Sequence, residues 1–158
     1  MDNLNSKIGV KVISASFGEG IISEITEMNK EPFFIVLNQA NNMKHYVPIN
    51  DSNAYRFIST EDLFLITLKE HLIDFNQNQK FASKKDRINF YKEQSKNQKL
   101  TNVCQNIKTL HLTEDKGSLE DQIYQRLIEN ISLEYSIIKK IKNDEALEFV
   151  ENLLKNLN

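Results

Sequence analysis

The chain has no tryptophan, one cysteine and four glycines among its 158 residues. The single cysteine, Cys104, excludes an internal disulfide bond and any metal site that needs a second cysteine, and it suits a reducing cytoplasm. The longest apolar stretches are four or five residues, far shorter than the roughly 20 that a membrane-spanning helix needs. The segment "FGEG" (17–20) lacks the spacing and the following lysine of a phosphate-binding loop. His45, His71 and His111 are scattered without metal-ligand spacing. These absences predict no metal, no cofactor and no membrane segment.

Charge of one sign is concentrated in the middle of the chain. The whole sequence carries 20 basic and 22 acidic side chains, a net charge of −2. The segment "KFASKKDRINFYKEQSKNQK" (80–99) nevertheless holds seven Lys or Arg against two acids, Asp86 and Glu93. Residues 1–79 and 113–158 are each net −4, whereas residues 80–112 are net +6. A run of this kind forms either a solvated helix face or a surface that binds a polyanion.

The first third of the sequence predicts β structure. Two β-rich runs in "VKVISASFGEGIISEI" (10–25) surround Gly18 and Gly20, which permit the tight reversal of a hairpin. The runs "FFIVLN" (33–38) and "MKHYVPI" (43–49) have strand length, and "YRFIS" (55–59) is a possible fifth strand. Short strands at regular spacing favour a small, highly bent antiparallel barrel of the Tudor-like or SH3-like kind.

From residue 60 onward the apolar residues recur at helical spacing. Ser59 or Thr60 is a cap for a first helix, and the segment "NQNQK" (76–80) is a plausible linker after it. Ser83 is the expected cap of the basic helix, and Ser118 that of a long helix reaching Ile138. Two further helices are expected around 100–110 and from about Asn143 onward. The predicted fold is therefore α+β, a β barrel followed by an α-helical bundle, with domains at 1–60 (barrel), 61–79 (helix and linker) and 80–158 (helical, DNA-binding).

The motifs occur in an order that resembles the CarD/CdnL family of bacterial RNA polymerase regulators. The matching segments are "IGVKVISASFGEGIISEI", "MKHYVPI", "ISTEDL", "LTNVCQNIKTLHL" and "GSLEDQIYQRLIENISLEYSIIKKI". The N-terminal part is similar to the polymerase-interacting domain that this family shares with transcription-repair coupling factor. The resemblance covers nearly the whole chain and implies a non-enzymatic, cytoplasmic, nucleoid-associated factor. Such a factor binds the RNA polymerase β subunit and promoter DNA at the upstream edge of the bubble, and it stabilises the open complex.

The resemblance also implies site residues. Those expected to bind polymerase are Met28, Phe33, Lys44 and Tyr46; those expected to bind DNA are Phe81, Lys84, Lys85, Arg87, Lys92 and Lys96. Family members commonly insert a tryptophan into the minor groove. This chain has none, and Phe81 is the aromatic residue nearest to that position. Met28 and Tyr46 stand where the family commonly has arginines, so electrostatics should contribute less to the polymerase contact.

Two other interpretations stay open. The barrel could pair with a partner's β edge in a pure protein–protein adaptor, with the basic helix merely solvated. An unrecognised enzyme is the third class, but no Ser-His-Asp or Cys-His arrangement can be proposed from the sequence. The leading prediction has no small-molecule substrate.

Overall fold

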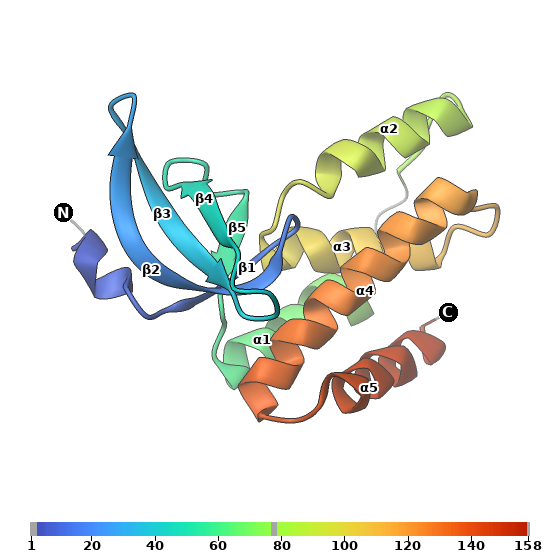
Figure 1. The fold of residues 1–158 in the computed structure, drawn as a ribbon. Coiled ribbons are helices and arrows are strands. Elements are labelled where there is room, and N and C mark those ends of the chain that lie inside the picture. The colour runs from blue at the N-terminus through green and yellow to red at the C-terminus, as the bar shows by residue number, and fades with distance from the viewer. Residues whose placement is uncertain (1–2, 77–78, 158) are drawn as a thin grey trace.

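The computed structural model describes residues 3–76 and 79–157, and it places a five-stranded antiparallel sheet before a set of helices (Figure 1). The sheet comprises β1 (Lys11–Ser14), β2 (Gly18–Met28), β3 (Glu31–Asn38), β4 (Lys44–Pro48) and β5 (Tyr55–Phe57), preceded by a 3-10 helix, η1 (Leu4–Lys7). The helices are α1 (Glu61–Leu68), which continues into a π-helical segment, η2 (Lys69–Ile73), then α2 (Lys84–Gln94), α3 (Leu100–His111), α4 (Ser118–Lys139) and α5 (Asn143–Lys155). The predicted α+β class, with strands before helices, is confirmed.

The sheet has the strand order β4-β3-β2-β1-β5 and is strongly bent along β2 (Figure 1). A bulge between Ile22 and Glu24 interrupts the β2–β3 register, and the Ser23 hydroxyl donates to the Ile35 carbonyl there. Bulges increase local twist and bend a strand, which explains the curvature. Gly20 leaves no room for a side chain, because a Cβ at that position would collide with Val36 Cγ1 on β3.

One face of the sheet encloses its own apolar core. The buried residues of this core are Val12, Ile22, Phe34, Val36, Val47 and Tyr55. They come from all five strands, as alternation along each strand requires when one face is buried. The aromatic rings of Phe34 and Tyr55 meet edge to face with centroids 5.8 Å apart.

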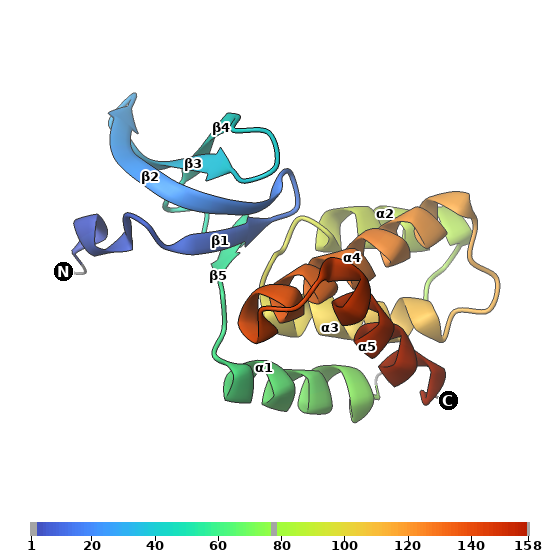
Figure 2. The same cartoon turned by 60° about the horizontal axis from the view of Figure 1, so that its bottom comes forward.

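The helices share a second core, and α1 belongs to it. Phe64, Leu68 and Leu72 of α1 and η2 are buried against α3, α4 and α5, where Ile107 and Ile131 are also fully buried. Figure 2 shows α1 and α2 on opposite sides of α3 and α4. Within the predicted helix-and-linker segment 61–79, the helix thus packs in the same core as the later helices. Residues 77 and 78 of the predicted linker lie outside the described residues.

Local capping explains where the helices begin. Thr60 caps α1 by accepting from the Leu63 N–H, and Ser83 caps α2 by accepting from the Asp86 N–H, so both predicted caps are confirmed. The prediction of Ser118 as a cap is wrong by one residue, because Gly117 caps α4 and Ser118 is the first helical residue. The physical reason is Glu120, whose carboxylate accepts from the Gly117 N–H three residues earlier.

Within residues 3–76 and 79–157, none of the helices combines the length and the apolar composition that crossing a bilayer requires.

Candidate nucleic-acid and protein interfaces

Helix α2 presents lysines on the side opposite to its buried face. Lys85 and Lys92 are exposed and seven residues apart, which is close to two helical turns, so they point the same way. Tyr91 is buried on the other side. Among the described residues, neither lysine has a carboxylate within ion-pair distance. Lys96 follows α2 in a turn and pairs with Glu93 at 2.9 Å. These three lysines form what we term the outer basic stripe, and two of them have no acidic partner.

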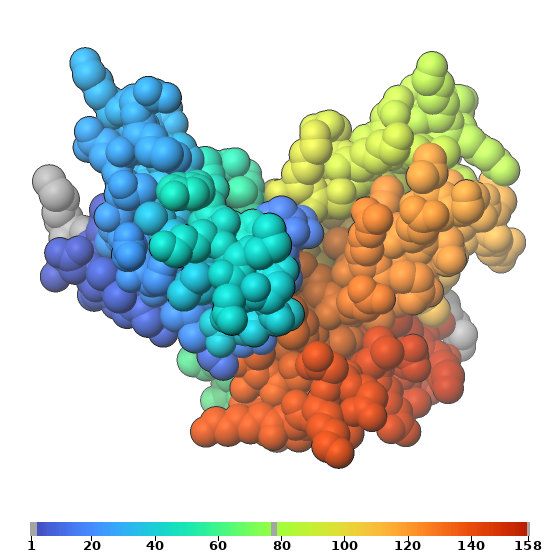
Figure 3. Space-filling view, in the orientation of Figure 1, coloured from blue at the N-terminus to red at the C-terminus, as the bar shows by residue number. Residues whose placement is uncertain are grey.

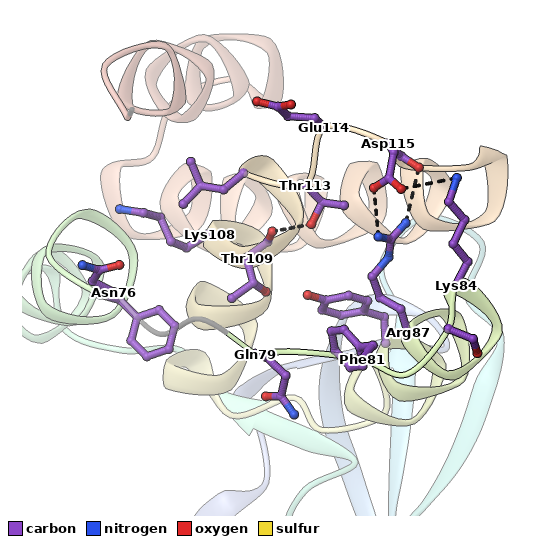
Figure 4. Close-up of a pocket in the computed structure, with 14 residues that line it drawn as sticks. Asn76, Gln79, Phe81, Lys84, Arg87, Lys108, Thr109, Thr113, Glu114 and Asp115 are labelled. Carbon is purple, nitrogen blue, oxygen red and sulfur yellow. Dashed lines mark hydrogen bonds and ion pairs between the residues drawn. The ribbon is translucent and has the colours of Figure 1, made fainter.

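Arg87 and Lys84 instead point toward the start of α4 (Figure 4). The Arg87 guanidinium donates to both Glu120 oxygens, at 2.6 and 2.8 Å, and to Asp115 Oδ1 at 2.9 Å. Lys84 Nζ lies 3.3 Å from Asp115. The Glu120 side chain is 1% exposed and that of Arg87 is 14% exposed. Of the cations predicted to bind DNA, Arg87 is therefore engaged in an internal ion pair, and Lys84 shares Asp115 with it.

The ionisation of this cluster follows from its hydrogen bonds. The pKa of Arg87 is raised, chiefly by its hydrogen bonds to Glu120. The same bonds hold the pKa of the Glu120 carboxyl below its ordinary value, although burial opposes this. Hydrogen bonds from Arg87, and then from Lys84, lower the pKa of Asp115. These shifts keep Arg87, Glu120 and Asp115 charged at neutral pH.

Phe81 packs inside the protein on one side and lines a cavity on the other. Its ring centroid lies 5.2 Å from that of Phe90 and 6.0 Å from that of Tyr91. The cavity, of about 660 Å³, lies between the start of α2 and the end of α3 and is also lined by Lys108 and Asp115 (Figure 4). The side chain is half-buried. Phe81 thus contacts the aromatic side chains of α2 rather than projecting fully into solvent.

The four residues predicted to bind polymerase lie on one face of the sheet. Thr26 pairs with Phe33, and Phe33 pairs with Pro48, so these positions share a face. Met28, Tyr46 and Lys44 follow at two-residue intervals along β2 and β4 and therefore lie on the same face. Phe33 is half-buried, whereas Met28 and Tyr46 are 38% and 53% exposed. Sequence reasoning therefore selected residues that the fold brings together, on the face opposite to the sheet's own core.

A buried polar junction joins the sheet to the helices, and sequence reasoning missed it. The Arg56 Nε donates to Glu134 Oε1 at 2.8 Å, its Nη1 to the Gln98 carbonyl at 3.0 Å, and its Nη2 to Asn130 Oδ1 at 2.6 Å. The Ser59 N–H donates to Glu134 Oε2 at 2.7 Å. One sequence signal was present, because Glu134 interrupts the apolar stripe of α4 formed by residues 127, 131 and 138. A carboxylate on such a stripe needs a buried cationic partner.

The groups with possible nucleophilic or metal-binding chemistry lie apart. Burial raises the pKa of the Cys104 thiol to about 12, so the thiolate nucleophile is scarce at neutral pH. His71 and His111 are hydrogen-bonded to Gln105 and Tyr124, and His45 stacks on Phe17. Across the part of the chain that the structure describes, there is no group of three or more His, Cys, Asp or Glu side chains that could hold a metal ion.

A comparison of the chain with protein-family models and with curated proteins found no match.

Proposed function

We propose that this protein is a CarD/CdnL-like transcription regulator that binds the RNA polymerase β subunit through its sheet and promoter DNA through α2. The observation that carries the proposal is the pairing of two different surfaces on one chain. One is an apolar sheet face with Met28, Phe33 and Tyr46, and the other is the outer basic stripe. In finer detail, we assign the strands to a Tudor-like barrel and the helices to a bundle.

The composition of each surface supports its proposed partner. Met and Tyr are enriched at the cores of protein interfaces, and one lysine, Lys44, lies at the edge of the same face. Lysines without acidic partners are suited to phosphates, because the attraction is not already satisfied within the protein. Lys85 and Lys92 therefore are the primary phosphate contacts in this proposal, with Lys96 adding to them. Arg87 supports α2 from beneath, and Lys84 can exchange Asp115 for a phosphate because its side chain is 67% exposed.

A pure adaptor is the second candidate function. The internal pairing of Arg87 removes one of the predicted DNA contacts, and the pairing of Lys84 with Asp115 weakens a second, which favours this alternative. An adaptor would bind a protein partner through the sheet and would not retard DNA at low salt. Direct DNA-binding measurements therefore separate the two functions.

The proposed function predicts binding to polymerase and a longer open-complex lifetime. Purified protein is expected to bind the isolated β subunit, and addition of the protein should slow open-complex decay in a competitor-challenge assay. Tyr46→Ala should weaken β binding about tenfold, as loss of an aromatic anchor does. Gln39→Ala, an exposed change in the β3–β4 turn, is the matched control and should leave binding unchanged. Absence of β binding by the unaltered protein would overturn the proposal.

Phe81 is the proposed wedge that lies against an unstacked base step. Phe81→Ala is expected to shorten the open-complex lifetime without changing β binding, since Phe81 lies on the helical side of the molecule. Thermal unfolding of the variant is a necessary control, because the ring also packs on Phe90 and Tyr91. An undiminished lifetime would remove the wedge role and leave only the lysine contacts.

A further inference from the structure

The junction between the sheet and the helices is a closed set of hydrogen bonds. Arg56 is 8% exposed, Glu134 is fully buried, and both Glu134 oxygens accept a hydrogen bond from the sheet side. The Asn130 amide accepts from Arg56 and donates to Gln98 Oε1 at 2.8 Å. Gln98 in turn donates its backbone N–H to the Asn53 carbonyl at 2.6 Å. Each charged group in the junction therefore has a directed partner on the opposite side.

Such a junction fixes the angle between the sheet and α4 as well as the distance between them. The guanidinium is planar, and its three nitrogens donate in three directions, to α4 twice and to the segment before α3 once. Any rotation of the sheet against α4 breaks several of these bonds at once and leaves a buried charge without a partner. Direct apolar contact at this boundary includes the start of β2, where Gly18 lies close to Leu133 of α4. Figure 3 shows that the sheet and α2 are otherwise separated by an open notch above α4.

The Arg56 junction joins the sheet to the helices by direct hydrogen bonds. A cavity of about 320 Å³ between the sheet and the helices is lined by Ser14 and Gly18 from the sheet side and by Gln98 and Asn130 from the helical side. The outer basic stripe lies on the helical part, and the sheet face with Met28, Phe33 and Tyr46 lies on the sheet. The Arg56 junction connects these two parts.

We propose that Arg56, Glu134, Asn130 and Gln98 are positioning residues that hold the two binding surfaces at one fixed angle, so that the chain binds polymerase and DNA simultaneously as a rigid bivalent ligand. This inference rests on the proposed function. A rigid connection raises the effective concentration of the second site once the first has bound, with gains of about 10²–10⁴ in overall affinity when the geometry fits. The chain is accordingly expected to bind most tightly to polymerase already bound to promoter DNA, where both binding sites lie at the distance that the rigid chain spans.

The rigidity of the junction can be measured on the free protein with one spin label on the sheet and one on α2. Met43→Cys and Asn89→Cys introduce exposed labelling sites on the sheet and on α2, and the buried Cys104 does not compete for the label. Pulsed electron–electron double resonance should give one narrow distribution of the distance between the labels at positions 43 and 89. Glu134→Gln should broaden it, because one amide hydrogen then faces an N–H donor of Arg56 or Ser59. Asn130→Ala is the milder second variant, and Glu129→Gln, an exposed change on the same helix, is the control.

The functional consequence is measured on the same variants. Glu134→Gln and Asn130→Ala should bind isolated β subunit and isolated promoter DNA as the unaltered protein does, yet their residence time on the polymerase–promoter complex should fall about tenfold or more. Unchanged residence together with a broadened distance distribution would overturn the bivalent role, and an unchanged distribution would overturn the rigid junction. Failure of the unaltered protein to bind β would overturn the proposed function instead, and the distance measurement would still test the junction.

Discussion

Arg87→Ala is expected to lower the free energy of unfolding by about 3 kcal/mol, the lower end of the cost of removing one partner of a buried ion pair, because the Arg87 side chain is 14% exposed. The guanidinium supplies two hydrogen bonds to Glu120, whose side chain is almost inaccessible to water. Without Arg87, the Glu120 carboxylate loses its cationic partner and keeps the long hydrogen bond from the Gly117 N–H at 3.3 Å. Urea unfolding followed by circular dichroism at pH 7 measures the change. This large effect is the opposite of what a solvent-exposed DNA-binding arginine would show.

Two controls distinguish the ion pair from a general effect of changing α2. Lys85→Ala, on the exposed side of the same helix, should change stability by less than about 0.5 kcal/mol, as is typical for surface positions. The double variant Arg87→Ala/Glu120→Ala should be more stable than Arg87→Ala, because no buried carboxylate is left without a cationic partner. An Arg87→Ala variant with the same urea midpoint as the unaltered protein would contradict the structural role.

The same pair makes the stability depend on pH with a definite sign. Arg87 lowers the pKa of Glu120 in the folded state, so the contribution is fully present above the ordinary carboxyl pKa. It is lost as the pH falls through the lowered value, because protonated Glu120 no longer needs the guanidinium. The difference in unfolding free energy between the unaltered protein and Arg87→Ala should therefore shrink under acid conditions.

The elements of the fold were predictable because their signals are local. The caps at Thr60 and Ser83 depend on a side chain and a backbone N–H three residues later. The strands depend on alternation and on turn residues within a few positions, and Cys104 lies on a local apolar stripe that correctly indicated burial. The shared face of the four residues predicted to bind polymerase follows from strand register, since residues two apart on a strand share a face.

The charge pairing was not predictable, because its partners are distant in sequence. Arg87 meets Glu120 33 residues later, and Arg56 meets Glu134 78 residues later. A count of lysines and arginines in 80–99 treats Arg87 and Lys85 alike, whereas the fold separates them onto opposite sides of α2. The basic segment is thus two surfaces, an inner one that attaches α2 to α4 and an outer one where Lys85 and Lys92 have no acidic partner among the described residues.

That division makes the outer lysines the decisive test of DNA binding, and Lys85→Glu/Lys92→Glu is expected to reduce affinity for duplex DNA about 60-fold at 0.1 M salt. Each phosphate contact on duplex DNA contributes about 0.9 to the slope of log affinity against log salt concentration. Two contacts therefore contribute about 1.8 logarithmic units of affinity at 0.1 M salt relative to 1 M salt, where this electrostatic contribution vanishes. Repulsion by the new glutamates adds to the loss. A salt titration of the equilibrium constant by fluorescence anisotropy measures both the affinity and the slope.

The matched control carries the same change of net charge at another place. Lys142→Glu/Lys155→Glu alters two exposed lysines at the ends of α5 and makes the protein equally more acidic. If DNA responds only to total charge, both double variants lose affinity alike, and the outer basic stripe has no special role. If the stripe binds phosphates, only the α2 variant loses affinity, and its salt slope falls by about two while that of the α5 variant does not. Because neither change touches Arg87, Glu120 or the Arg56 junction, α2 stays in position, and the difference between the two variants reports where the phosphates bind.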